Sequence, residues 1–358
     1  MVAIPVRGAG PLAGDRRRRA ARLRLLLGAG LAAAMLLSLG WGAAGETDVT
    51  AALLARAGLA EASLRDSVIV WDIRLPRMLA GVLVGAALAV SGAVMQGLFR
   101  NPLADPGLVG VSSGAGLGAV LAIAGTGLLP AALQSFVGPW LLPLSAFAGG
   151  WLAVLLLYRM ATQNGRTSVA TMLLAGIALG ALSGALTGLL VYRATDDELR
   201  DLTFWNMGSV AGVTWARLGA AAPFILAALA AAPFLARSLN ALALGEAAAL
   251  HLGIDVQRMK RIAILAAAAS AGASVALTGG IGFVGIVVPH LLRLVQGPDH
   301  HGLLVNAGLA GAILLLLADA VSRSIIAPAE LPIGIVTACL GGPVFLWIVL
   351  RSRAQLEL

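Results

Sequence analysis

Long apolar stretches alternate with short polar or charged segments along nearly the whole chain. A helix needs about 20 mainly apolar residues to cross the hydrocarbon core of a membrane. By that measure the sequence predicts about ten spans, and 282–296 is short and follows a glycine-rich break. The pattern therefore predicts an all-α polytopic membrane protein in which residues 1–358 form a single transmembrane domain. The predicted spans are 25–45, 78–98, 108–129, 141–158, 168–191, 218–236, 262–279, 282–296, 303–322 and 331–350.

Composition supports the membrane class and excludes several others. The chain is 59% hydrophobic and 12% charged, about half the charge of a typical soluble domain. The single cysteine, Cys339, permits no intrachain disulfide and no cysteine-based metal site. A disordered chain and a disulfide-stabilised secreted domain are both excluded, and we predict no metal site.

The distribution of arginines predicts the orientation. With the N-terminus inside, most of the 25 basic residues lie on the cytoplasmic side, as the positive-inside rule requires. Ten spans then place both termini in the cytoplasm. The same rule explains the net charge of +8, so we infer no nucleic-acid partner. The first apolar run is longer than that of a signal peptide, which favours a retained helix.

Glycines recur every four residues on several predicted spans, from Gly176 to Gly188, from Gly110 to Gly118, and at Gly81 and Gly85. Small residues at this spacing form a face on which helix backbones approach closely. Tight static packing is the simpler interpretation, and sliding of helices in a gate is the alternative.

Ionisable residues are scarce within the spans. Asp319 lies four residues before Arg323, so the two can meet on one helix face. We expect an ion pair there rather than a proton relay. The absence of a series of membrane carboxylates disfavours a proton- or sodium-coupled mechanism. The His300-His301 pair beside Asp299 is expected to lie in a solvated loop rather than in a metal site.

Motifs of catalysis are absent from the sequence. A phosphate-binding loop requires a glycine-rich turn before a lysine, and the only lysine, Lys260, has no glycine before it. The chain is therefore not expected to be an enzyme. Between two predicted spans, residues 238–254 are too polar to cross a membrane and too helix-prone for a simple loop. Gly245 and Gly253 are expected to divide them into two short cytoplasmic helices suited to docking a soluble partner.

Several motifs in consistent order resemble the permease subunits of ABC importers for cobalamin, haem and ferric siderophores, known as the FecCD type. The resemblance runs from about residue 70 to the C-terminus. The matching motifs are Arg74-Leu75-Pro76-Arg77, Ser91-Gly92-Ala93-Val94-Met95-Gln96, Asn101-Pro102-Leu103-Ala104-Asp105-Pro106-Gly107, Ala243-Leu244-Gly245-Glu246, Leu252-Gly253, Gly282-Phe283-Val284-Gly285, Val288-Pro289-His290 and Glu330-Leu331-Pro332-Ile333-Gly334.

The resemblance implies a type II ABC importer permease architecture. It implies a homodimer with ten helices per subunit, two ATPase subunits that bind ATP and Mg, and a periplasmic substrate-binding protein. No cofactor is expected on this chain itself. Arg74, Arg77 and Arg323 match outer-face arginines that receive acidic residues of the binding protein. Such pairs would serve steering and register more than affinity.

The resemblance also implies roles for residues at the inner face. The cytoplasmic gate maps onto Asn101, Leu103, Thr167 and Ser168. The stretch 238–254 corresponds to the helices that couple the permease to the ATPase. Within it, the residues expected to make the ATPase contact are Gly245, Glu246 and Gly253.

Three cargo classes fit the resemblance, and residues 196–209 look more like the haem importers than the cobalamin permease. We therefore expect haem, with ferric siderophore and cobalamin as alternatives. The candidate cargo contacts are Met95, Arg193 and Arg200, the arginines meeting the haem propionates. From a different class, an ion-coupled secondary transporter is the alternative. A purely structural or receptor protein is disfavoured because polar breaks at membrane depth are tolerated mainly where they line a path.

Overall fold

The structure, a computed structural model, describes residues 13–41, 47–127 and 130–356. Arg7 of the predicted inner arginine cluster, both chain ends and the apolar segment's predicted end at 42–45 lie outside these residues. The predicted cytoplasmic location of the two termini can therefore be judged only from the first and last described helices.

The described chain is almost entirely helical, apart from one short hairpin. The elements are α1 (Ala13–Gly40), α2 (Val49–Ala55), α3 (Leu64–Val68), the π-helix η1 (Ile69–Arg74), α4 (Leu75–Phe99), the 3-10 helix η2 (Pro106–Val109), α5 (Val111–Thr126), α6 (Ala131–Ala161), β1 (Thr162–Gln163), β2 (Arg166–Thr167), α7 (Val169–Arg193), α8 (Asp196–Met207), α9 (Trp215–Leu242), α10 (Glu246–His251), α11 (Val256–Thr278), α12 (Val284–Gln296), α13 (His300–Ser324) and α14 (Ile333–Leu356).

Each of the ten predicted spans coincides with a helix. Eight helices of the described chain are long and apolar enough to cross a membrane, and α5 and α12 are shorter apolar helices. The short span at α12 was expected, whereas α5 is shorter than the predicted 108–129. It begins only at Val111 because residues 101–110 form a turn and a 3-10 helix. Pro102, Pro106 and the left-handed Gly110 (φ +80°) oppose a continuous α-helix there.

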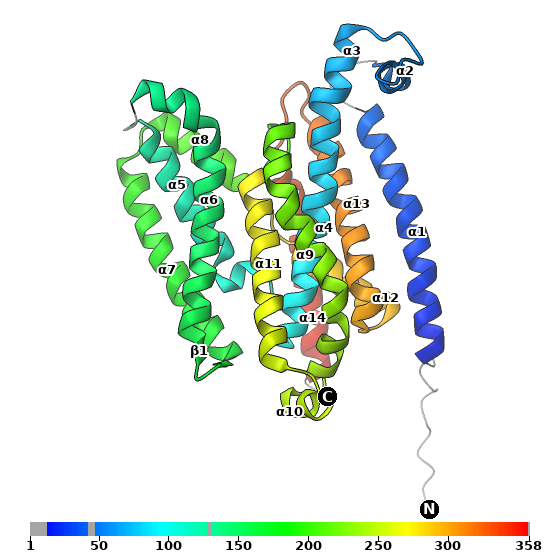
Figure 1. The fold of residues 1–358 in the computed structure, drawn as a ribbon, viewed down its shortest axis with the longest axis vertical. Helices are drawn as coiled ribbons and strands as arrows, with labels where there is room; N and C mark the ends of the chain where they lie inside the picture. The colour runs from blue at the N-terminus through cyan, green and yellow to red at the C-terminus, as the bar shows by residue number, and fades with distance from the viewer. Residues whose placement is uncertain (1–12, 42–46, 128–129, 357–358) are drawn as a thin grey trace, which may run out of the picture.

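Helix α4 is the centre of the molecule, and most of its surface is buried. It packs against α9, α11, α12 and α13, while α5, α6, α7 and α8 form a group to one side and α1 lies against α13 on the other (Figure 1). The core of the larger cluster consists of alanine, valine and leucine side chains from α4, α9, α11 and α13. A single continuous core therefore supports the helices on which the candidate sites lie.

The predicted close approach of helices at glycines is confirmed. A Cβ on Gly85 would strike the backbone of Gly311, so α4 and α13 touch along their main chains. Gly114 on α5 meets Gly149 on α6 in the same way. The glycines of α7 behave differently, since a Cβ on Gly184 or Gly188 would meet no atom within 4 Å. The α7 glycine face is thus open in the single chain.

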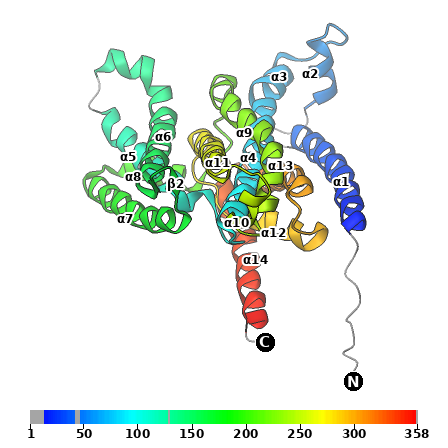
Figure 2. The same cartoon turned by 60° about the horizontal axis from the view of Figure 1, so that its bottom comes forward.

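The two ends of the bundle carry different elements. Helices α2, α3 and α8 lie at one end, which we call the outer end (Figure 1). The hairpin β1–β2, α10, the start of α1 and the end of α14 lie at the opposite end, the inner end (Figures 1 and 2). These names follow the orientation predicted from the arginines.

Candidate transport and docking sites

Three buried charged side chains and the partly exposed Glu330 form a cluster toward the outer end. Arg77 on α4 donates to Asp319 on α13 through Nε (3.0 Å) and Nη2 (2.8 Å), and to Glu330 through Nη1 (2.7 Å). Arg323 Nε lies 3.2 Å from Asp319 Oδ2, a distance that makes an ion pair, although the N–H is not aligned as a hydrogen bond. The predicted ion pair between Asp319 and Arg323 is confirmed. The buried carboxylate of Asp319 thus lies between two guanidinium groups, and Glu330 pairs with Arg77 from the surface.

The expected exposure of Arg74, Arg77 and Arg323 is wrong. Their residues are only 4%, 6% and 5% exposed. Arg74 donates to the Leu39 carbonyl oxygen (2.6 Å) at the end of α1, and Arg323 donates to the Trp41 carbonyl oxygen (2.9 Å). A charged side chain at this depth requires partners, and here they come from the same chain. The three arginines therefore hold α1, α4 and α13 together toward the outer end, and their docking role stays a prediction.

The candidate cargo contacts lie in two different environments. Met95 has no exposed surface and belongs to the central core, which contradicts the expectation that it faces a path. Arg193, in the last turn of α7, and Arg200, on α8, are exposed. The Arg200 guanidinium lies 5.9 Å from the ring centre of Phe204. The α7–α8 corner thus presents two cations at the outer end, set among the carboxylates of Asp196, Asp197, Glu198 and Asp201.

The four predicted gate residues lie on two segments next to the inner end. Asn101 follows α4 and is exposed, with its Oδ1 accepting from the Leu103 amide (2.9 Å). Ser168 caps α7 by accepting from the Thr171 amide. Thr167 ends the β1–β2 hairpin and is only 4% exposed. Among the described residues, no hydrogen bond or ion pair joins the Asn101 segment to the hairpin, and their joint role as a gate stays a prediction.

The segment 238–254 differs from the expected pair of short helices. Residues 238–242 continue α9, and only α10 is separate. Gly245 (φ +106°) and Gly253 (φ +77°) flank α10 in a conformation that L side chains rarely adopt. Together they produce a tight turn on each side of the short helix, which projects from the inner end (Figure 1).

Helix α10 and the turns beside it expose three leucines, although Ala249 of α10 is buried. Leu244, Leu250 and Leu252 are 72%, 60% and 56% exposed. Leucines gathered on a projecting turn mark an interaction surface more often than a solvated one. Sequence reasoning identified the segment and its glycines but missed these leucines, which differ from the surrounding apolar residues only in the direction they face.

A buried lysine joins the predicted coupling helix to the predicted gate. Lys260 on α11 is 1% exposed, and its Nζ donates to Glu246 Oε1 (2.7 Å) and to the Thr167 carbonyl oxygen (2.9 Å). Gln257, one turn earlier, accepts from the Thr167 amide (2.9 Å). In the sequence, Lys260 was notable only because the residue directly before it is not a glycine, which excluded a phosphate-binding loop. The one sequence feature that could have marked it as functional is that the chain has no other lysine.

The expected solvated loop at His300-His301 is wrong for the first of these residues. His300 is 5% exposed at the start of α13, with its Nδ1 2.8 Å from Asn240 Oδ1. His301 is exposed and lies 2.9 Å from Asp299. Asp299 instead caps α13, and no group of three metal-ligating side chains occurs among the described residues. The pair is therefore part of a helix start, not a free loop.

Comparison with known proteins agrees with this arrangement. Residues 30–351 match the FecCD transport family. The chain is 47% identical to the hemin transport system permease protein HmuU of Yersinia pestis, covering 80% of this chain and 84% of that protein. It is 48% identical to the vitamin B12 import system permease protein BtuC of Salmonella typhi, covering 81% and 86%.

A solved structure supports the same fold. An ABC transporter of the metal-chelate type in an inward-facing conformation has a TM-score of 0.79 and 32% identity, covering 92% of this chain and 99% of that chain. The match spans nearly all the helices described above. The chain therefore belongs to the FecCD transport family and is the multi-pass permease subunit of an ABC importer in the bacterial inner membrane.

Proposed function

We propose that this permease carries haem across the inner membrane, delivered by a periplasmic binding protein and driven by a separate ATPase subunit. The observation that carries the cargo proposal is the α7–α8 corner, where Arg193 and Arg200 are exposed at the outer end. Haem presents two propionates to such cations, whereas cobalamin presents mainly neutral amides. The hemin and vitamin B12 relatives are about equally similar, so overall identity does not support one cargo over the other. The cargo proposal rests on these two arginines, which would have to meet the propionates beside the carboxylates of Asp196, Asp197, Glu198 and Asp201.

All four histidines lie away from this corner, on α10, α12 and the start of α13. Haem would therefore pass the outer arginines without an imidazole ligand to its iron. Weak, charge-based contacts suit a transporter, because a site that coordinated the iron would retain the cargo.

The experiment is ATP-dependent uptake into proteoliposomes that hold the permease and its ATPase. Haem, cobalamin and a ferric siderophore are offered in parallel, each with its binding protein. The proposal expects uptake of haem alone. Uptake of cobalamin or of the siderophore instead of haem would overturn the cargo and leave the ABC importer assignment intact.

The outer arginines provide a sharper test of the cargo. Replacing Arg193 and Arg200 together with alanine is expected to slow haem uptake about tenfold at low ionic strength, because attraction between opposite charges raises the rate of encounter. The difference should shrink as salt is raised. Arg217→Ala is the control, since this outer arginine is half-buried and donates to the Pro139 carbonyl oxygen. Normal uptake by the double variant would contradict the propionate contact.

We infer that the Glu246–Lys260–Thr167 connection links ATPase movement to the gate. Helix α10, with Gly245, Glu246 and Gly253, is the proposed ATPase contact, and its exposed leucines would fill an apolar cleft on that subunit. A displacement of α10 would act on Thr167, beside Ser168 at the start of α7, through the Lys260 ammonium. Asn101 and Leu103 would form the facing part of the gate.

We propose a homodimer that uses the open face of α7. That helix exposes Leu174, Ile177, Leu182 and Leu189 together with the uncovered glycines Gly184 and Gly188. Small residues beside large apolar ones allow two such helices to approach closely in a membrane. The cargo path would then run between the two copies.

A bulky residue on this face should prevent assembly. Gly184→Leu is expected to convert the detergent-solubilised permease from dimer to monomer, as measured by light scattering coupled to gel filtration. Gly116→Leu on α5 is the control, because a Cβ there also meets no atom within 4 Å. A Gly184→Leu variant that stays fully dimeric would exclude α7 as the interface.

The proposed orientation keeps both termini in the cytoplasm. The starts of α1 and α13, α10 and the end of α14 share the inner end (Figure 1), and α1 begins with the arginine run Arg16-Arg17-Arg18-Arg19. The binding protein would then dock on the outer end. There the buried Arg74, Arg77 and Arg323 would support the docking surface, and the exposed Arg56 and Arg65 near α2 and α3 would lie nearer to an acidic partner.

A further inference from the structure

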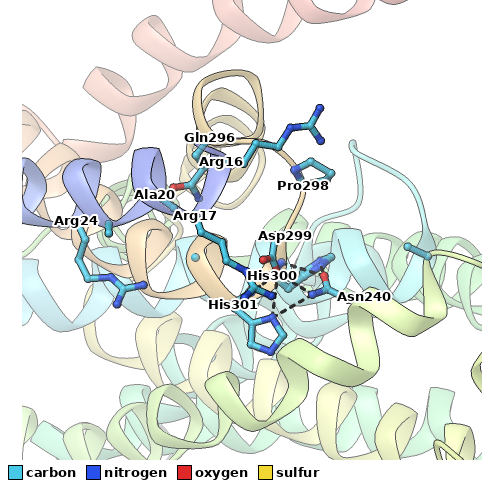
Figure 3. Close-up of a pocket in the computed structure, with 13 residues that line it drawn as sticks. Arg16, Arg17, Ala20, Arg24, Asn240, Gln296, Pro298, Asp299, His300 and His301 are labelled. Atoms are coloured by element: carbon cyan, nitrogen blue, oxygen red, sulfur yellow. Dashed lines mark hydrogen bonds and ion pairs between the residues drawn. The ribbon is translucent and has the colours of Figure 1, made fainter. Parts of the chain in front are cut away.

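The inner end contains an open basic cleft that none of the proposed transport contacts uses. It has a volume of about 950 Å³. Its walls are the first turns of α1, the end of α9 and the turn from α12 into α13 (Figure 3). Arg16, Arg17 and Arg24 line it from α1, and Asn240 and Asp299 line it from the opposite side.

The three arginines of the cleft are exposed. Within the part of the chain that the structure describes, none of them has an ion pair or side-chain hydrogen bond, whereas the neighbouring Arg19 pairs with Asp15. One carboxylate faces them, that of Asp299. It already accepts from Asn240 Nδ2 (2.7 Å) and from the backbone amide of His301 (3.0 Å). The cleft therefore has an excess of uncompensated positive charge.

A buried polar group beside the arginines also lacks a partner. Gln296 lines the cleft and is 4% exposed. Its Oε1 accepts from Asn306, but its Nε2 has no hydrogen-bond partner among the described residues. A buried amide donor left without an acceptor is unusual in proteins and costs free energy. An oxygen-rich anionic ligand would supply the missing acceptor.

A separate apolar groove lies along the same helices as the cleft, nearer to the middle of the bundle. It has a volume of about 260 Å³, and α1, α9 and α13, which line the cleft, also line the groove. Leu31, Pro233 and Gly308 line it from these helices. Each groove residue lies seven positions from a cleft residue on the same helix: Leu31 from Arg24, Pro233 from Asn240, and Gly308 from His301. Seven residues correspond to about 10 Å along a helix. The three displacements all point away from the inner end, as the directions of the helices in Figure 1 show.

From this arrangement we propose that the cleft and the groove together bind an anionic phospholipid, with its phosphate at Arg16, Arg17 and Arg24 and an acyl chain along α1 and α13. The other walls of the groove are Val82, Ala86 and Val90 of α4, so the chain would contact the central helix directly. A free phosphate or a nucleotide would use the cleft and leave the groove empty. Basic pockets between transmembrane helices at the surface of a leaflet are typical of anionic headgroup sites.

The test is native mass spectrometry of the delipidated permease–ATPase complex titrated separately with cardiolipin, phosphatidylglycerol and phosphatidylcholine. We expect saturable binding of the two anionic lipids and not of phosphatidylcholine. Replacing Arg16, Arg17 and Arg24 with glutamine should weaken anionic lipid binding roughly fivefold per arginine, or about 100-fold in all.

The same helix provides a matched control. Replacing Arg18, Arg19 and Arg22 with glutamine removes the same charge from α1, but none of these three lines the cleft. This variant should retain nearly full lipid binding. An equal loss in both triple variants would show general attraction to the basic helix and would overturn the site.

The groove is tested independently. Val305 lines it, and Val305→Phe should fill it and weaken lipid binding while leaving the arginines in place. If inorganic phosphate competes with the lipid and Val305→Phe has no effect, the cleft binds phosphate alone and the lipid proposal is wrong. If the first triple variant instead loses its ATPase subunit with lipid binding unchanged, the cleft is a protein contact, and the proposal is equally wrong.

Discussion

Replacing Lys260 with methionine is expected to abolish cargo uptake while the complex continues to hydrolyse ATP. Methionine fills the space of the buried side chain but removes the ammonium that binds both Glu246 and the Thr167 carbonyl oxygen. Hydrogen bonds to charged groups contribute about 1.5–3 kcal/mol, which corresponds to about ten- to 100-fold in the equilibrium between linked and unlinked arrangements. The measurement is the ratio of cargo imported to ATP hydrolysed in proteoliposomes.

Two further variants separate lost coupling from lost folding. Arg258→Met is the matched control, since Arg258 is exposed on the same helix and donates only through its backbone amide. Glu246→Gln keeps a hydrogen-bond acceptor at a side chain that is 42% exposed and should reduce the ratio less than Lys260→Met. A Lys260→Met complex with the melting temperature and the import-to-hydrolysis ratio of the native protein would exclude the lysine as the link.

Replacing Asp319 with asparagine is expected to cause the largest loss of stability among single changes at the outer end. Asp319 is 2% exposed and is the ion-pair partner of both Arg77 and Arg323. Without it, Arg77 retains Glu330, but Arg323 retains only oxygen atoms of residues near the end of α1. Breaking a buried ion pair from one side typically costs about 3–5 kcal/mol, because the remaining charge stays buried. Thermal denaturation of the detergent-solubilised permease measures the loss.

A control variant and a compensating double variant test whether the loss comes from an unpaired buried charge. Asp15→Asn removes the exposed pair with Arg19, whose side chains are about half exposed, and should change stability by about 1 kcal/mol at most. Combining Asp319→Asn with Arg323→Met removes the stranded charge and should recover much of the lost stability. If Asp319→Asn melted like Asp15→Asn, the cluster would not be what holds α1, α4 and α13 together.

The membrane spans were predictable because their positions depend on a single property, apolar character over about 20 consecutive residues. A segment such as 303–322 is apolar over the thickness of a membrane and is bounded by polar residues, so burial in lipid leaves a helix as its only stable form. The same local pattern predicted the short α12 after its glycine break. It failed at 108–110, where apolar residues form η2 and a left-handed turn before α5 begins. Prolines and glycines decide such boundaries, and their effect depends on the neighbouring turn.

The candidate site was predictable only in part. The i, i+4 spacing of Asp319 and Arg323 places them on one helix face whatever the fold, so their ion pair could be expected. The partner of greater consequence, Arg77, lies 242 residues away from Asp319, and no local pattern indicates that contact. Met95 shows the same limit. Its motif placed it on a membrane span, but nothing near it in the sequence indicated that other helices bury it completely.

Sequence alone was enough to predict a helical, multi-pass membrane protein with about ten apolar segments, an excess of arginine between particular segments and no phosphate-binding loop. These properties depend on composition and on spacing within single segments. Each segment partitions into lipid or water according to its own residues, without help from distant parts of the chain. Helix packing, by contrast, is what buries Arg74, Arg77 and Arg323, joins Lys260 to α10 and the β1–β2 hairpin, and brings α1, α9 and α13 together around a basic cleft and an apolar groove. These features depend on contacts between helices far apart in the chain, and such contacts exist only once the helices have packed.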